Sequence, residues 1–78
     1  MLKPGTKVEV LSNNTNNPMF RGVITRIRLS PTEPGKVCYD VEGYWLTVGG
    51  RVKGQRTANA WLEGTYFRVA GASLPVKG

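Results

Sequence analysis

The chain has 78 residues with eleven Lys and Arg, five Asp and Glu, no His and one Cys, so its formal net charge is +6. A chain this short forms one domain, because it buries only roughly 60–65% of the surface that it exposes when unfolded. The composition excludes an internal disulfide, a zinc site of His and Cys, and any catalytic triad that needs an imidazole. We therefore expect no metal, no cofactor and no catalytic residues, and a domain that binds rather than an enzyme.

The sequence also indicates a compartment. Residues 1–5 lack the apolar segment and cleavage site of a secretory signal. No apolar stretch approaches the roughly 20 residues of a membrane helix, so we expect no membrane partner. A single unpaired cysteine, Cys38, fits a reducing compartment, which favours a cytoplasmic location. Because no basic residue flanks Cys38, we interpret it as a buried structural thiol.

Hydrophobic residues recur mainly with a period of two, which predicts β-strands. The expected strands are residues 6–11, 19–29, 36–41, 65–69 and 74–76. Segments 12–18 and 30–35 consist of turn-forming residues and are expected as loops. Gly22 inside the second strand predicts a bend or bulge. By simple alternation, Ile24, Arg26 and Arg28 share one face of that strand.

Residues 44–55 have the pattern of a β-hairpin. Gly49 and Gly50 separate two strand-like segments, which predicts a two-residue type I′ turn with positive φ at both glycines. The counted register pairs Val48 with Arg51, Leu46 with Lys53, Tyr44 with Gln55 and Trp45 with Gly54. Arg51 and Lys53 are then expected on the same face as Tyr44.

Two further segments suggest short helical structure. Residues 57–64 contain two alanines and a leucine and end at Gly64, which is compatible with one helical turn. Residues 70–73 are small and suggest a 3₁₀ turn before the last strand.

Four segments, residues 5–10, 20–27, 39–41 and 69–76, follow one another in an order that resembles the SH3-like small barrels, which include Tudor and KOW modules. The resemblance implies an all-β fold: one SH3-like barrel over residues 1–78, with five or more short strands and a short helical or 3₁₀ turn. Residues 42–64 depart from the pattern and are expected as an inserted β-hairpin, which contains both tryptophans. Because Tudor-type and KOW-type modules bind nucleic acid or protein, the resemblance also implies a binding module.

Basic residues form two groups without an acid between them, one on the second expected strand and one on the hairpin. Cations neutralise phosphates and aromatic rings stack on bases, so this pattern favours nucleic acid, DNA or RNA, bound with little sequence specificity. The candidate nucleic-acid-binding residues are Arg26, Arg28, Tyr44, Trp45, Arg51, Lys53 and Arg56.

Other interpretations of these residues stay open. The cations could form a solvated outer face that keeps the domain soluble. The hairpin could instead dock a protein partner, as in an inhibitor or assembly factor of a phage or mobile element, or pair with its own copy in a homodimer. Trp45 and Trp61 could form an aromatic cage with Tyr44 or Tyr66, although core packing is favoured. The outline is also similar to that of plasmid-borne trimethoprim-resistant dihydrofolate reductases, but the Val-Gln-Ile-Tyr segment of those enzymes is absent.

Overall fold

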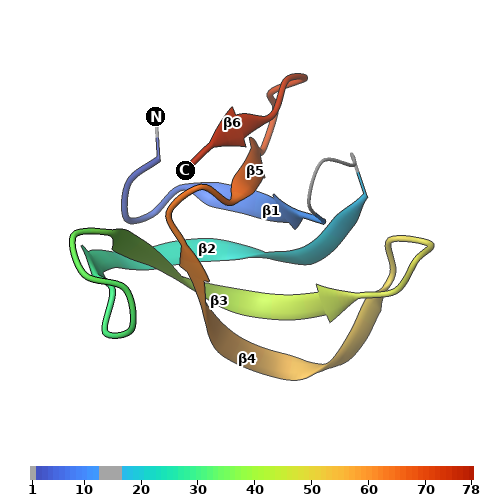
Figure 1. Ribbon diagram of the computed structural model, residues 1–78. Helices are drawn as coiled ribbons and strands as arrows, with labels where there is room; N and C mark the ends of the chain where they lie inside the picture. The colour runs from blue at the N-terminus through green and yellow to red at the C-terminus, as the bar shows by residue number, and fades with distance from the viewer. Residues whose placement is uncertain (1, 13–16) are drawn as a thin grey trace.

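The computed structural model describes residues 2–12 and 17–78, which form a single antiparallel sheet of six strands (Figure 1). The strands are β1 (Lys7–Leu11), β2 (Pro18–Leu29), β3 (Val37–Leu46), β4 (Val52–Leu62), β5 (Tyr66–Val69) and β6 (Val76–Lys77). The all-β prediction is confirmed. The described residues contain no helix, and hence no helix able to cross a membrane.

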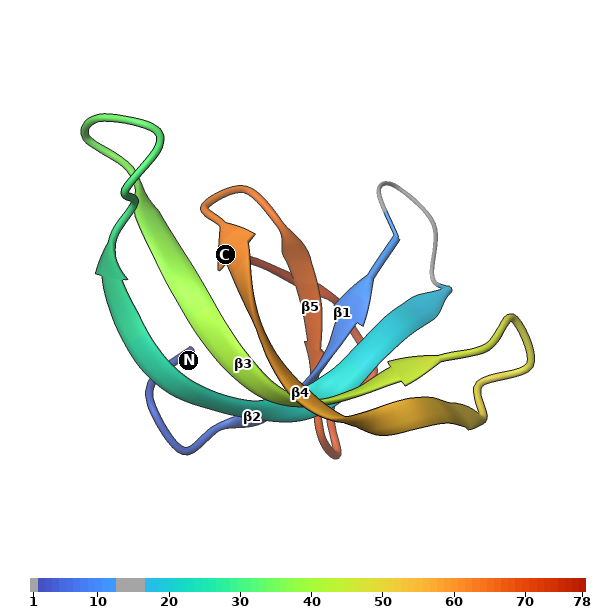
Figure 2. The same cartoon turned by 90° about the horizontal axis from the view of Figure 1, so that it is seen from below.

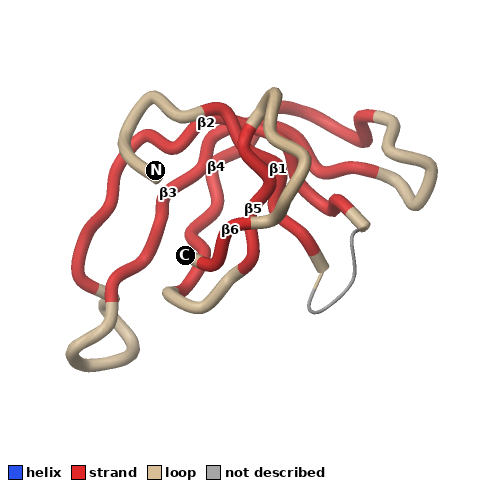
Figure 3. The backbone as a smooth tube through the Cα atoms, turned by 90° about the horizontal axis from the view of Figure 1, so that it is seen from above, coloured by secondary structure: helices blue, strands red, loops and turns tan. Residues whose placement is uncertain are grey.

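The sheet order is β4-β3-β2-β1-β5-β6, so the first four strands form a meander and β5 returns to pair with β1. The sheet coils strongly into an open trough (Figure 2). It does not close, since β4 and β6 are edge strands within the described part of the chain. The loops that follow β2 and β3 project from opposite ends of the molecule (Figure 3).

The core fills the concave face of the trough. Val10 lies opposite both Phe20 on β2 and Phe67 on β5, and all three side chains are fully buried. Ile24 and Val41 extend this core across β2 and β3. Burial of alternate strand residues is the expected source of stability in a sheet with one covered face. Cys38 is buried as well, as the sequence predicted.

Gly22 and Gly43 face each other across β2 and β3. A Cβ atom on Gly22 would overlap the carbonyl oxygen of Glu42, and one on Gly43 would overlap the carbonyl oxygen of Arg21. Only a pair of residues without side chains permits this approach of two backbones.

A β-bulge in β2 changes the face on which its arginines lie. The register of β2 and β3 shifts between Ile24 and Arg26, so Thr25 is an extra residue. Ile24 therefore packs in the core while Arg26 lies opposite Asp40. The prediction that Ile24 and the two arginines share a face was wrong, because simple alternation does not anticipate a bulge.

The hairpin between β3 and β4 has a three-residue turn, so the expected type I′ turn was wrong. Thr47 and Arg51 close the turn through a 2.8 Å N–H···O bond, and the Gly50 N–H donates to the Thr47 carbonyl. Only Gly50 has positive φ, at 80°, as in a type I turn with a G1 bulge. The register consequently moves by one residue, and Trp45 lies opposite Lys53 rather than opposite Gly54.

The expected helical turn within residues 57–64 is also absent, because residues 57–62 belong to β4. Pairing with β3 satisfies the backbone there, and this tertiary context outweighs the local helical propensity. Residues 70–73 form a turn closed by the Ala72 N–H and the Val69 carbonyl, without a 3₁₀ helix. Residues 42–64, expected as an inserted hairpin, comprise the second half of β3, the turn, β4 and the start of the β4–β5 connection.

Candidate nucleic-acid interface

The two arginines on β2 share one carboxylate. Arg28 donates to both oxygens of Asp40, from Nε at 2.8 Å and from Nη2 at 3.0 Å, and Arg26 donates from Nε at 2.9 Å. These bonds, above all those from Arg28, hold the pKa of Asp40 below its ordinary value of 3.8. The sequence contains no acid between the arginines, but the adjacent strand provides one. These hydrogen bonds occupy guanidinium donors that would otherwise be available to a phosphate.

Arg56 is paired in the same way. Its Nε and Nη2 donate to Oε1 of Glu42 at 3.0 and 2.6 Å, and this carboxylate raises the pKa of Arg56. Tyr44 lies on the same face of the sheet, opposite Arg21 on β2. Both predicted site residues, Tyr44 and Arg56, line a hollow on the outer face.

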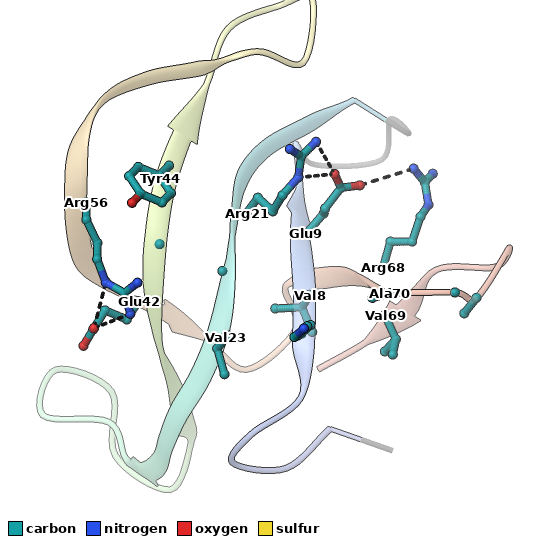
Figure 4. Close-up of a pocket in the computed structure, with 15 residues that line it drawn as sticks. Val8, Glu9, Arg21, Val23, Glu42, Tyr44, Arg56, Arg68, Val69 and Ala70 are labelled. Carbon is teal, nitrogen blue, oxygen red and sulfur yellow. Dashed lines mark hydrogen bonds and ion pairs between the residues drawn. The ribbon is translucent and has the colours of Figure 1, made fainter.

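The hollow has a volume of about 500 Å³ and is lined by residues of all five strands from β1 to β5 (Figure 4). Arg21 and Arg68 approach Glu9 on one side of it, at 2.9 and 3.9 Å, while Arg56 and Glu42 lie on the other side. Sequence reasoning missed this Glu9 cluster because its three members are remote in the chain. Alternation within β1, β2 and β5 places each of them on the outer face, but only the strand order brings them together.

Trp45 and Trp61 meet on the concave side of the sheet, which the sequence alone could not establish. Their ring centroids are 5.6 Å apart, and each ring also contacts Phe20, at 5.1 and 5.8 Å. Phe20 is fully buried, whereas Trp45 remains 39% exposed. Tyr44, one of the two tyrosines expected for an aromatic cage, lies in the hollow on the outer face and is not part of this cluster. The cluster is therefore core packing that leaves one tryptophan accessible.

The end of the β3–β4 hairpin combines this exposed ring with two cations. Lys53 lies directly opposite Trp45, and Arg51 follows the turn. Both basic side chains are exposed, and neither forms an ion pair within the described part of the chain. Val48 and Val52 beside them are also exposed. This hairpin end (residues 45–53) thus presents an aromatic ring, apolar side chains and uncompensated positive charge together.

The structure does not unite all seven predicted residues. Arg28 lies opposite Cys38 near one end of β3, and Lys53 lies opposite Trp45 near the other end. Seven residues of strand separate these positions, which corresponds to up to roughly 23 Å. The predicted residues therefore divide into three places: Arg26 with Arg28, Tyr44 with Arg56, and Trp45 with Arg51 and Lys53.

Among residues 2–12 and 17–78, no three His, Cys, Asp or Glu side chains lie close enough together to hold a metal ion. Comparison with known proteins shows no matching family model, no matching curated protein and no matching solved structure. The geometry of the chain itself is thus the basis for assigning a function.

Proposed function

We propose that this protein is a small binding module that holds single-stranded nucleic acid, DNA or RNA, at the hairpin end. The observation that carries the proposal is the juxtaposition of an exposed Trp45 ring with Lys53 and Arg51, two cations that no described carboxylate neutralises. Stacking on an aromatic ring tolerates any base, and phosphate contacts carry no sequence information, so the binding is expected to be largely non-specific.

The distribution of ion pairs favours the hairpin end, rather than the arginines of β2, as the site of phosphate contact. Arg26 and Arg28 are ion-paired with Asp40, and Arg56 is ion-paired with Glu42. Cations held by carboxylates release few counterions when a phosphate approaches, which weakens their contribution to affinity. We therefore assign phosphate contact to Arg51 and Lys53, and an auxiliary role to Arg56 at most.

The fold is compatible with the same proposal. We infer an SH3-like small barrel that has stayed open, because a four-strand meander whose fifth strand returns to the first is the arrangement that brings such a sheet toward closure. In this arrangement the β3–β4 hairpin extends beyond the part of the sheet that surrounds the core (Figure 2). A protruding β-ribbon is one of the elements that proteins use to contact nucleic acid.

A salt titration tests the proposal. We expect a fluorescently labelled oligothymidine to bind at about 50 mM salt, with Trp45 emission quenched on binding, and the affinity to fall as salt rises. The Arg51→Ala/Lys53→Ala variant loses two phosphate contacts, so the slope of log affinity against log salt decreases by about 1.4. The matched control is Lys3→Ala/Lys77→Ala, which removes equal charge from exposed lysines outside the hairpin.

Three results decide the matter. If the control variant loses less affinity for the oligonucleotide than the hairpin variant, Arg51 and Lys53 contact the nucleic acid directly. If the two variants lose affinity equally, only the net charge of the protein matters, and the assignment of binding to the hairpin end is overturned. Absence of binding by the wild-type chain at about 50 mM salt, where phosphate contacts are strongest, overturns the function itself.

One observation favours a second candidate, a protein-interaction module. β4 pairs only with β3 among the described strands, so its other side is open to strand addition. A specific partner that remains bound to the protein in a nuclease-treated lysate, together with absence of oligonucleotide binding, would favour this function over the first.

A further inference from the structure

A second hollow lies beside Trp45, at the base of the hairpin end. Its volume is about 510 Å³, within the range of about 300–1,000 Å³ that is usual for small-molecule sites. The residues that line this Trp45 hollow are Trp45, Leu46, Lys53, Gly54, Gln55 and Thr57. They combine an aromatic ring with one cation and two neutral polar side chains, so the hollow differs in chemistry from the apolar core.

The register of β3 and β4 explains why these side chains gather. Trp45 lies opposite Lys53, and Gly43 lies opposite Thr57, so one residue of β3 faces three residues of β4 between these pairs. The extra residues form a β-bulge that includes Gly54, which has a positive φ of 79°. A bulge bends the strand that contains it, and the hollow lies at this bulge.

The polar side chains that line this hollow have no partner in the part of the chain that the structure describes. Lys53, Gln55 and Thr57 occupy alternate positions of β4, and none of the three side chains forms a hydrogen bond or an ion pair there. Arg56, which lies between them on the outer face, is instead paired with Glu42. An ammonium, an amide and a hydroxyl are thus available to a ligand beside an exposed aromatic ring.

This combination of groups matches a nucleotide. An aromatic ring stacks on a base, a side-chain amide pairs with a donor and an acceptor on the base edge, and an ammonium contacts a phosphate. A neutral sugar would leave the cation unused, and an acidic side chain would leave the ring unused. A nucleotide uses all of the groups that the hollow presents.

We propose that the Trp45 hollow holds one nucleotide of the bound strand and prefers adenine at that position. A purine covers more of the Trp45 ring than a pyrimidine does, which strengthens stacking. Adenine presents a donor and an acceptor side by side, N6–H and N7, and the Gln55 amide can pair with both. Guanine presents two acceptors on the same edge, which leaves the Gln55 carbonyl without a donor. One position is therefore selective in a strand that is otherwise bound without sequence specificity.

The first test is competition between mononucleotides. Each deoxynucleoside monophosphate is titrated against the complex of the protein with labelled oligothymidine, at a fixed ionic strength of about 50 mM. We expect deoxyadenosine monophosphate to displace the oligonucleotide at a concentration roughly 5- to 20-fold lower than deoxyguanosine monophosphate does. This ratio is the lower part of the discrimination that a bidentate contact to a base provides, because Gln55 is exposed to water.

Two methionine variants show whether the preference comes from the amide. Gln55→Met keeps the length of the side chain but removes its donor and acceptor, so the preference for adenine should disappear. Ala58→Met adds the same side chain to the same strand, opposite Glu42 and outside the hollow. This matched control is expected to retain the preference.

The second test observes the amide itself by NMR. Gln55 is the only glutamine in the chain, so its side-chain amide signal in an isotope-labelled sample is identified by its loss in Gln55→Met. We expect the Gln55 amide signal and the Trp45 indole N–H signal to shift together as deoxyadenosine monophosphate is added. Shifts of both signals place the base between the ring and the amide.

Equal displacement by all mononucleotides overturns the adenine preference. A preference that survives Gln55→Met, or that Ala58→Met abolishes equally, overturns it as well, and so does a Gln55 amide signal that does not shift at saturating nucleotide. The preference rests on the proposed function, since it concerns one nucleotide of the same strand. Oligothymidine binding without any base preference overturns only the role of the hollow, whereas a chain that binds no oligonucleotide overturns the proposed function.

Discussion

The facing glycines of β2 and β3, Gly22 and Gly43, allow the energetic cost of blocking this close backbone approach to be measured. Gly43→Ala would place a methyl group on the carbonyl oxygen of Arg21 and against the Cα of Gly22. Both obstacles are backbone atoms of a paired strand, so they cannot move without breaking the ladder. Overpacking that the surroundings can absorb costs about 1–3 kcal/mol, and we expect Gly43→Ala to reach or exceed the upper value.

That cost is large for this chain. At roughly 0.05–0.15 kcal/mol per residue, a domain of this size has a total unfolding free energy of about 4–12 kcal/mol. With a urea slope of about 1 kcal/mol per molar, a loss of 3 kcal/mol lowers the midpoint by about 3 M. The transition can be followed by tryptophan emission, because Trp45 and Trp61 both pack against buried Phe20.

Two other glycines provide matched controls for the same substitution. Gly49 has no positive φ, and a Cβ there would approach only the Thr47 hydroxyl, at 3.8 Å. Gly49→Ala is therefore expected to be neutral or to stabilise by about 0.4–1 kcal/mol through the unfolded state. Gly50→Ala has space but retains a φ of 80°, which costs about 1–2 kcal/mol. A Gly43→Ala midpoint within experimental error of Gly49→Ala would refute the reasoning.

Two predictions concern the interior and the β2 arginines. Asp40 stays ionised in the folded chain at a pH where the unfolded chain is protonated, so its stabilisation is complete above about pH 4 and is lost as the pH falls through the lowered pKa. Asp40→Asn should flatten this acid-side loss in urea titrations; an unchanged profile would contradict the role of Arg28. Phe20→Leu should lower the unfolding free energy by about 1–3 kcal/mol, because it removes two aromatic contacts, and an unaltered urea midpoint would show that these contacts contribute little.

Local patterns were sufficient for the all-β class and for part of the strand content, but not for residues 57–62 of β4. Alternation of apolar residues identified the strands that became β1, β2 and β5, and turn-forming residues marked the loop after β2. The absence of histidine, with one cysteine, restricted the chemistry before any fold was known. These properties follow from composition and nearest neighbours along the chain, so they need no tertiary information.

The pairing register of β2 with β3, and of β3 with β4, depended on features that the alternation of the sequence does not reveal. One extra residue at Thr25 moved Arg26 away from the Ile24 face, and a three-residue turn moved Lys53 opposite Trp45. Since side chains alternate with a period of two, each shift of one residue reverses the face of everything beyond it. A single bulge was therefore enough to make the sequence assign candidate site residues to the wrong face of the sheet.

Which basic side chains are ion-paired and which are not was likewise determined only by the folded structure. In the sequence, Arg26 and Arg28 look as uncompensated as Arg51 and Lys53. Strand pairing places Asp40 beside the first two, and within the described residues it places no carboxylate on the last two. Composition thus determined that the chain is basic, and the alignment of strands remote in sequence determined which cations remain available to a ligand.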